Sequence, residues 1–368
     1  MAPDVIVIGG GAIGTSITYE LVKRGVSVTL LERGRIGGGA TGASAGLVMP
    51  RGGRDVPPDL TGLGQESARL FGALAGELRE LTGIDIGYRH VDVLEVAFDD
   101  TEERSLRREY GRMTANRWLD PMSALDLEPR LNPSVRGAFH VTGDHQVLPR
   151  VLAQALVRAA SDLGASVLEG VSADRLELHG DRVLGVGVGN QTIAAGEVVI
   201  ANGAWAGAWS KPLGFALPVR PVRGQMVSVN TAGSGLRTVI SGAGGYAVTK
   251  PDGSTLLGTT VEEAGFDPRP TVQGIASLLE RAPRLAPDLA EATIVSAWAG
   301  LRPATPDGLP IIGRAPGWHG LTLATGHFRN GILMAPITGE LVSDLLHRDQ
   351  PRLPISRFDP CRFVVDAA

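Results

Sequence analysis

The sequence predicts an α/β protein in which a domain built on a parallel sheet is interleaved with a second, β-rich domain. Two observations support this fold class. A strand, a helix and a second strand occupy the first 32 residues, which is the length of one parallel βαβ unit. Residues 218–298 consist mainly of short strand-like pieces, and a helical pattern returns after them. At about 150 residues per domain, 368 residues provide two or three structural units.

The order of elements follows from apolar spacing: leucines three or four residues apart indicate helices, and short β-branched runs indicate strands. The first half is expected to contain strand Asp4–Ile8, helix Ile13–Arg24, strand Val26–Glu32, helix Leu60–Leu81, strand Tyr88–Phe98, and helices Thr101–Trp118 and Pro149–Leu163. Strands Ser166–Leu168, Ala173–His179, Val183–Val188, Val198–Ala201, Gln225–Val229, Tyr246–Lys250 and Ser254–Thr260 follow, with helices Thr271–Arg281 and Gly331–Leu346. Gly180 and Asp181 predict a hairpin turn.

Composition excludes several classes of protein. Hydrophobic residues are 43% and charged residues 20% of the chain, so a disordered, collagen-like or coiled-coil protein is not expected. The net charge is −4 and aromatic residues are only 5%, which argues against nucleic acid as a partner. No apolar stretch is long enough to span a membrane, and the N-terminus does not resemble a signal peptide. Cys361 is the only cysteine, which excludes an intramolecular disulfide and favours a cytoplasmic setting.

A glycine-rich loop supplies the first functional motif. Residues 9–14 read Gly-Gly-Gly-Ala-Ile-Gly, a G-x-G-x-x-G pattern placed after a strand and at the start of a helix. In this context Gly9 permits a tight turn, Gly11 lets the backbone approach a pyrophosphate, and Gly14 lets helix and strand pack closely. Glu32 ends the next strand and is expected to accept hydrogen bonds from ribose hydroxyls, while its charge disfavours NADP. NAD and FAD both remain possible at this point.

Three stretches resemble the flavin-dependent amino-acid oxidases, the family that includes glycine oxidase, D-amino-acid oxidase and monomeric sarcosine oxidase. They are DVIVIGGGAIGTSITYELVKRGVSVTLLERG with GATGASAG, then EVVIANGAWAGAW, and finally WAGLRPATPDGLPIIGR with ATGHFRNGILMAP. The last pair is most similar to glycine oxidases of thiamine biosynthesis. The resemblance implies a Rossmann-type FAD-binding domain at 1–85, 141–215 and 302–368. It also implies a β-rich (α+β) substrate-binding domain at 86–140 and 216–301.

The resemblance also implies the cofactor, a non-covalently bound FAD, because Cys361 lies outside the position at which some members attach flavin. Thr41 and Ser44 are expected to donate hydroxyl hydrogen bonds to phosphate, and Val171 to contact adenine through its backbone. A helix starting at Gly331 would direct its N–H groups at the flavin. The full set of expected cofactor-binding residues is Gly9, Gly11, Ala12, Ile13, Gly14, Glu32, Arg33, Thr41, Ala43, Ser44, Val171, Gly203, Trp205, Arg302, Arg329, Asn330, Gly331, Ile332 and Leu333.

An amino-acid oxidase must bind a carboxylate, which arginine does with two parallel hydrogen bonds. Arg302 is the leading candidate, and a structural ion pair with an internal acid is the alternative. Tyr246 is the expected second carboxylate contact, and Arg329 is expected near the carboxylate or the flavin. His327 is expected to be structural, because hydride transfer to flavin needs no protein base. No metal-binding spacing is present.

The expected reaction is oxidation of the C–N bond of glycine or another small D- or N-methyl amino acid to an imine, with dioxygen reduced to hydrogen peroxide. The first alternative is a D-amino-acid or N-methyl-amino-acid dehydrogenase that uses a quinone or carrier. A nucleotide-binding module without redox activity and an NAD-linked dehydrogenase are further alternatives. Gly244 and Gly245 occupy a stretch where some glycine oxidases have a histidine, so a more open pocket is expected. A homo-oligomer is expected by analogy with the family.

Overall fold

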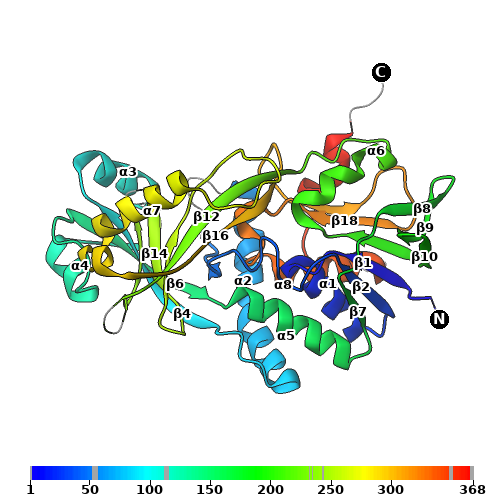
Figure 1. Cartoon of the computed structure of the whole chain (residues 1–368), viewed down its shortest axis with the longest axis horizontal. Helices are drawn as coiled ribbons and strands as arrows, with labels where there is room; N and C mark the ends of the chain where they lie inside the picture. Colours follow the sequence, from blue (N-terminus) through cyan, green and yellow to red (C-terminus); the bar gives the residue numbers. More distant parts are fainter. Residues whose placement is uncertain are drawn as a thin grey trace.

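The computed structural model describes residues 2–51, 57–111, 116–231, 233, 235–242, 244–347 and 351–364. Within them the strands form one six-stranded, one three-stranded and one nine-stranded sheet. The six-stranded sheet and its helices lie at one end of the molecule, and the nine-stranded sheet lies at the other (Figure 1). The α/β fold class is therefore confirmed, whereas the domain boundaries inferred from the sequence stay a prediction.

The six-stranded sheet is parallel except at its β17 edge. Its strands, in spatial order, are β17 (Ile311–Arg314), β18 (Leu321–Thr325), β11 (Glu197–Ile200), β1 (Val5–Ile8), β2 (Val28–Glu32) and β7 (Ser166–Glu169). Along β1, Val5 and Val7 join one apolar core and Ile6 and Ile8 join another. Because successive side chains point to opposite faces, this strand is buried on both, as its continuous apolar run predicts.

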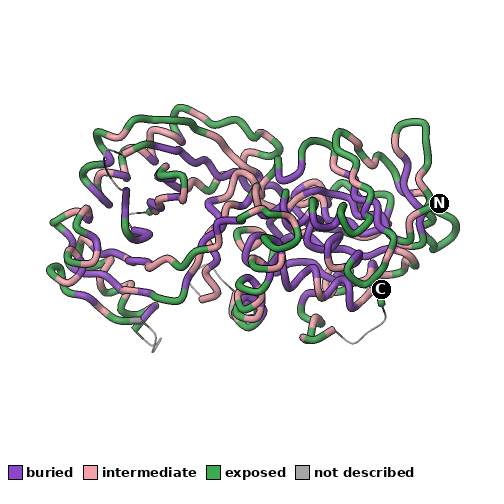
Figure 2. The backbone as a smooth tube through the Cα atoms, turned by 90° about the horizontal axis from the view of Figure 1, so that it is seen from below, coloured by how far each residue is buried: buried purple, intermediate pink, exposed green. Residues whose placement is uncertain are grey.

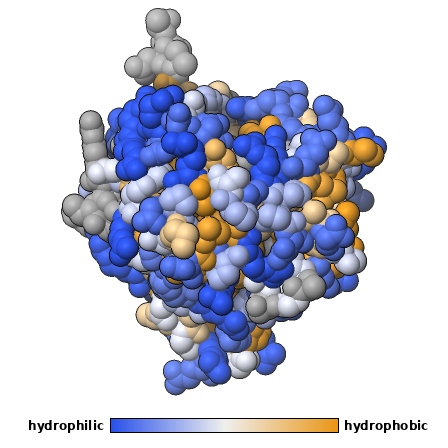
Figure 3. Space-filling view, turned by 90° about the vertical axis from the view of Figure 1, so that its left-hand side faces the viewer, coloured by the Kyte–Doolittle hydropathy of each residue, from blue (hydrophilic) through white to orange (hydrophobic). Residues whose placement is uncertain are grey.

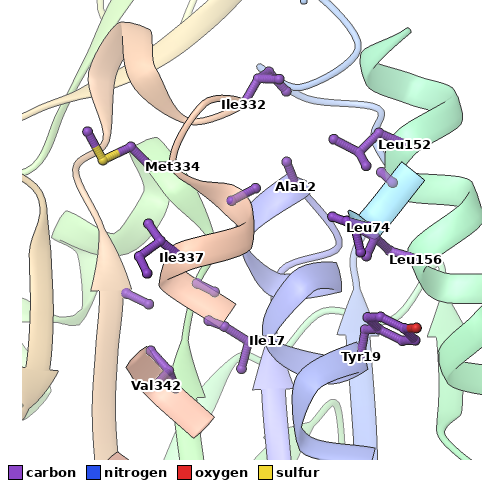
Figure 4. Close-up of a cluster of buried hydrophobic side chains, with 14 of the residues drawn as sticks. Ala12, Ile17, Tyr19, Leu74, Leu152, Leu156, Ile332, Met334, Ile337 and Val342 are labelled. Carbon is purple, nitrogen blue, oxygen red and sulfur yellow. The ribbon is translucent and has the colours of Figure 1, made fainter. Parts of the chain in front are cut away.

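Helices cover one face of this sheet, and a small antiparallel sheet covers the other. The helices are α1 (Ala12–Lys23), α2 (Pro58–Thr82), α5 (Pro149–Asp162) and α8 (Ala335–His347). Figure 4 shows Ile17 of α1, Leu74 of α2, Leu156 of α5 and Ile337 of α8 meeting in this core. The small sheet consists of β8 (Arg175–His179), β9 (Arg182–Val188) and β10 (Gln191–Ala194). The predicted hairpin at Gly180, where φ is +60°, joins β8 to β9.

The nine-stranded sheet carries the second half of the fold. Its strands, in spatial order, are β16 (Thr293–Ala304), β12 (Arg220–Asn230), β15 (Thr255–Gly258), β14 (Gly245–Thr249), β13 (Val239–Gly242), β4 (Arg89–Ala97), β6 (Gly137–Gln146) and β3 (Leu47–Val48), with β5 (Asn116–Leu119) also paired to β6. Helix α7 (Val272–Leu285) packs with α4 (Pro121–Leu127) in a core on one face. On the opposite face, Val93, Met226 and Val239 form another core beside Tyr246.

The remaining helical segments are short. They are α3 (Asp100–Tyr110), α6 (Ser210–Leu213) and the 3₁₀ helices η1 (Gly203–Trp209), η2 (Pro287–Glu291), η3 (Phe328–Asn330), η4 (Ser356–Phe358) and η5 (Pro360–Phe363). The tube in Figure 2 is most continuously buried around the six-stranded sheet. The end formed by the nine-stranded sheet is largely hydrophilic with scattered apolar groups (Figure 3), and Val272, Ile294 and Val295 are among the exposed apolar residues.

Two helix predictions are wrong at an end. The helix expected over Thr101–Trp118 stops at Tyr110, and residues 116–119 form strand β5 because Trp118 packs edge-on against Phe139 of β6. The helix expected from Gly331 begins at Ala335, after a turn. Pro336 explains this shift, since proline lacks an N–H donor and is tolerated in the first turn of a helix.

Candidate active site

A single large cavity lies between the two major sheets. Its volume is about 1770 Å³, well above the roughly 300–1,000 Å³ of an ordinary small-molecule pocket. Its walls include the loop after β1, the end of β2, the segment after β11, and the inner face of the nine-stranded sheet. The cavity is thus long enough in its wall elements, and large enough in volume, to hold a dinucleotide together with a small substrate.

The glycine-rich loop has the geometry that a bound pyrophosphate requires. Gly9 has φ of +114°, and a Cβ there would lie 2.6 Å from the carbonyl oxygen of Ala201. A Cβ on Gly14 would lie 1.8 Å from the carbonyl oxygen of Gly9, so Gly14 brings α1 against β1 as predicted. Gly11 and Ala12, at the start of α1, line the cavity, where the partial positive charge of the helix favours phosphate.

The predicted phosphate contacts Thr41 and Ser44 also line the cavity, but their hydroxyls have protein partners. Thr41 Oγ1 accepts a hydrogen bond from the backbone N–H of Ala12 at 2.9 Å. Ser44 Oγ donates to the carbonyl oxygen of Thr41 at 2.9 Å. Thr41 therefore keeps its own hydroxyl proton for a ligand, whereas Ser44 would have to exchange its partner. Both phosphate roles stay predictions.

The far end of the cavity has features suited to an adenosine. Both oxygens of Glu32 are held at 2.7 Å by backbone N–H groups, of Gly10 and Gly34. This fixes the carboxylate at the end of β2, where a ribose would meet it. The guanidinium of Arg33 lies 3.6 Å from the ring centroid of Trp205 and forms one flat wall. The residues present therefore fit FAD at this end.

All but one of the expected cofactor residues line the cavity. Those that do are Gly9, Gly11, Ala12, Ile13, Glu32, Arg33, Thr41, Ala43, Ser44, Val171, Gly203, Trp205, Arg302, Arg329, Asn330, Gly331, Ile332 and Leu333. Gly14 does not, because it packs α1 on β1. Gly331 and its neighbours reach the cavity from a turn rather than from a helix, so the expected helix dipole does not begin there.

Arg302 comes from β16, on the face of the nine-stranded sheet that borders the cavity. Its Nη2 donates to Thr259 Oγ1 at 2.7 Å, and its Nη1 donates to the carbonyl oxygen of Thr260 at 3.2 Å. Within the described ranges, no carboxylate oxygen lies within 4.0 Å of this guanidinium. Desolvation lowers the pKa of Arg302, but an arginine stays charged in a protein. The alternative of a structural ion pair is thus not supported there.

Tyr246 and Arg329 line the same cavity. The Tyr246 hydroxyl lies 3.9 Å from Met226 Sδ, and a Cβ at Gly258 would lie 2.7 Å from that hydroxyl, so this glycine makes room for the ring. Burial raises the pKa of Tyr246 to about 12, against the opposing effect of Arg302 and Arg329. Tyr246 therefore keeps its proton and can donate a hydrogen bond to a carboxylate.

His327 also borders the cavity but is poorly suited to be a base. It is buried, and its Nε2 lies 3.1 Å from Thr338 Oγ1. Burial lowers its pKa to about 3, so the imidazole is neutral. In the part of the chain that the structure describes, no cluster of potential metal ligands is found. No helix in that part is sufficiently long and apolar to cross a bilayer.

The sequence analysis missed two groups of cavity residues. Thr259 and Gly224 touch the Arg302 guanidinium, and both come from strand ends or strands without a motif. Arg51 forms ion pairs with Glu95 (3.3 Å) and Asp144 (2.9 Å) beside the cavity. These residues are far apart in the sequence and only sheet pairing brings them together, so no local pattern could have identified them.

Comparisons with known proteins agree with this geometry. The family model described as FAD dependent oxidoreductase matches residues 4–345. The glycine oxidase of Geobacillus kaustophilus is 39% identical over 370 residues, covering 98% of this chain and 97% of that one. Its crystal structure has a TM-score of 0.93 and covers 99% of both chains at 38% identity.

Two further proteins extend the comparison. The iminodiacetate oxidase of Chelativorans sp. BNC1 has a TM-score of 0.89 and is 30% identical, with 97% of this chain and 98% of that one covered. The bifunctional protein ThiO/ThiG of Trichormus variabilis is 35% identical over 373 residues, which is all of this chain and 56% of that protein. This chain is an FAD-binding enzyme and belongs to the family of FAD-dependent oxidoreductases that includes the glycine oxidases.

Proposed function

We propose that this protein oxidises the C–N bond of glycine, or of another small D- or N-methyl amino acid, to an imine. The observation that carries the proposal is Arg302, a charged guanidinium in the cavity whose printed partners are a hydroxyl and a carbonyl rather than a carboxylate. Such a group can pair with a substrate carboxylate. Tyr246 donates a further hydrogen bond to that carboxylate, and Arg329 adds positive charge nearby.

In this proposal the protein supplies position and electrostatics, and bound FAD supplies the acceptor for the hydride leaving the substrate Cα. The carboxylate contacts hold that Cα in the cavity. Loss of the hydride and of one amine proton leaves the imine, which water hydrolyses to the 2-oxo acid and ammonia or an amine. Dioxygen takes up the two electrons and two protons and leaves as hydrogen peroxide.

Several finer assignments belong to the same proposal. Glycine is favoured by the similarity to glycine oxidases, and N-substituted glycines by the similarity to iminodiacetate oxidase. The likeness to ThiO/ThiG supports a role in thiamine biosynthesis. Cys361 is exposed and is absent from the cavity wall, which supports non-covalent FAD. A homo-oligomer in the cytoplasm, with no nucleic-acid partner, completes the proposal.

The test is a peroxide assay of the purified yellow protein under air with glycine, sarcosine, D-alanine and D-proline. We expect peroxide with at least one of them, and an increase in KM of about 100-fold or more in Arg302→Ala, because a hydrogen-bonded charge pair is lost. Turnover that requires an artificial acceptor would instead favour the dehydrogenase alternative. Unchanged saturation behaviour in Arg302→Ala would refute the carboxylate assignment.

A further inference from the structure

The guanidinium of Arg302 is held from behind by one short segment of chain. Thr259 Oγ1 accepts from Nη2 at 2.7 Å, and the carbonyl oxygen of the next residue, Thr260, accepts from Nη1 at 3.2 Å. An arginine has two N–H groups on each Nη atom. Each terminal nitrogen thus uses one donor on this segment and keeps one more, which is the number that a bidentate carboxylate needs.

From this arrangement we infer that Thr259 is a positioning residue for substrate binding, which acts by orienting Arg302. The inference rests on the proposed function, in which Arg302 binds the substrate carboxylate. Since an arginine side chain has several rotatable bonds, a guanidinium anchored only by its own chain could swing within so large a cavity. The Thr259 hydroxyl removes that freedom before the substrate arrives, and so lowers the entropy cost of binding.

Thr259 is itself held firmly. Its Oγ1 donates to the carbonyl oxygen of Gln225 at 3.1 Å, so the hydroxyl proton points away from Arg302 and the oxygen is left as an acceptor. The backbone N–H of Gln225 in turn donates to Thr260 Oγ1 at 2.9 Å. This pair of contacts ties the segment to strand β12.

The Gln225 side chain is also fixed. It is fully buried, its Nε2 donates to Glu262 Oε1 at 2.7 Å, and its Oε1 accepts from the N–H of Thr271 at 2.8 Å. Arg223 holds the same Glu262 carboxylate with its Nε at 3.0 Å. The Arg302 anchor is therefore backed by an ion pair and an amide on a central strand rather than by a loose loop.

A neutral hydroxyl suits this role better than a carboxylate would. A carboxylate so close to Arg302 would neutralise the guanidinium and compete with the substrate carboxylate for it. Thr259 instead fixes the orientation and leaves the positive charge in place. Glu262, the acid behind the segment, already has partners in Arg223 and Gln225.

The test compares the holoenzyme variants Thr259→Val and Thr259→Ser with Thr255→Val. Thr255 is a matched control because it lies on β15, is fully buried and bonds Thr249 Oγ1 at 3.0 Å. The readouts are the Kd for acetate, which carries a carboxylate but cannot be oxidised at a C–N bond, from the flavin absorption spectrum, and the KM and kcat for the best substrate. Melting temperature and FAD content are measured in parallel.

We expect Thr259→Val to raise both the Kd for acetate and the KM about tenfold, as for the loss of a hydrogen bond to a charged group. Thr259→Ser should restore most of the affinity, and Thr255→Val should leave it unchanged. Thr259→Ala removes the same hydroxyl with a smaller side chain and replaces Thr259→Val if that variant does not fold. A wild-type Kd in either variant lacking the hydroxyl, or an equal loss in Thr255→Val, would overturn the inference.

Arg302→Ala separates the two levels of the proposal. If it binds acetate as tightly as the wild type, the carboxylate assignment itself fails. If Arg302→Ala loses acetate binding while Thr259→Val retains it, the carboxylate assignment stands and only the positioning role of Thr259 is refuted.

Discussion

Replacing Gly224 with alanine should inactivate the enzyme without unfolding it. Gly224 lies on β12, opposite Gly300 of β16. A Cβ at position 224 would lie 1.9 Å from Arg302 Nη1, 2.1 Å from Nη2 and 2.2 Å from Cζ. All three atoms belong to the guanidinium, which is the far end of a flexible side chain. The backbone can therefore stay in place while the guanidinium moves aside.

The size of the movement follows from these contacts. Ordinary van der Waals contact to a Cβ begins at about 3.4 Å, so Nη1 must move by about 3.4 − 1.9 = 1.5 Å. That breaks the 2.7 Å hydrogen bond to Thr259 and displaces the carboxylate site. A misplacement of about 1 Å can cost on the order of 100-fold in rate, or about 2.7 kcal/mol in transition-state stabilisation.

The assay is steady-state peroxide production together with thermal unfolding of the FAD-loaded enzyme. We expect kcat/KM for the best substrate to fall about 100-fold, while the free energy of unfolding changes by less than about 1 kcal/mol, as for a glycine-to-alanine change without backbone strain. Gly62→Ala on α2 is the matched control, because a Cβ there meets nothing within 4 Å. Wild-type kinetics in Gly224→Ala would refute the reasoning that the Arg302 guanidinium occupies this place during catalysis.

Three further predictions concern other parts of the site. Tyr246→Phe should raise KM about tenfold through loss of one hydrogen bond to a carboxylate, and because the pKa of Tyr246 is about 12, the two pH profiles should coincide up to pH ~10; profiles that diverge below that pH would contradict this. His327 has a pKa of about 3 in the folded protein, so the unfolded chain binds a proton below pH ~6.5 that the folded chain does not, and this difference should lower the free energy of unfolding by about 2 kcal/mol between pH 7.5 and 5. Denaturant unfolding should show a smaller pH dependence in His327→Gln, and an unchanged one would exclude His327 as the cause. Gly14→Ala would place a Cβ 1.8 Å from the carbonyl oxygen of Gly9, so it should cost about 1–3 kcal/mol of stability and reduce FAD content, measured as flavin absorbance per chain; full FAD content would contradict that expectation.

Most of the nucleotide-binding half could be predicted because its signals are local. A β-branched run, a spaced glycine motif and an acid at the end of the next strand occupy residues 5–32. Each has a short-range steric or electrostatic reason, and the structure places Gly9, Gly14 and Glu32 accordingly. The Gly331 segment shows the limit of such reasoning, because Pro336 delays the helix start and a helical pattern alone does not reveal it.

The substrate half was harder to predict because its contacts are long-range. Arg302 was identified by resemblance, but its partners Thr259 and Gly224 lie 43 and 78 residues away in the chain (302 − 259 and 302 − 224). Strands β12, β15 and β16 must pair in register before these residues meet. Threonines and glycines are also common in turns and strands, so neither residue type signals a role.

By itself, the sequence determined the α/β class, the phosphate-binding loop and the identity of the cationic residue for the substrate. These depend on residue type and spacing within single elements. Only the tertiary structure decided that the guanidinium is held by a hydroxyl and a carbonyl and has room above Gly224. The physical reason is that hydrogen bonds and steric contacts act over a few ångströms in space, whereas residues that make them are separated along the chain by whole strands and loops.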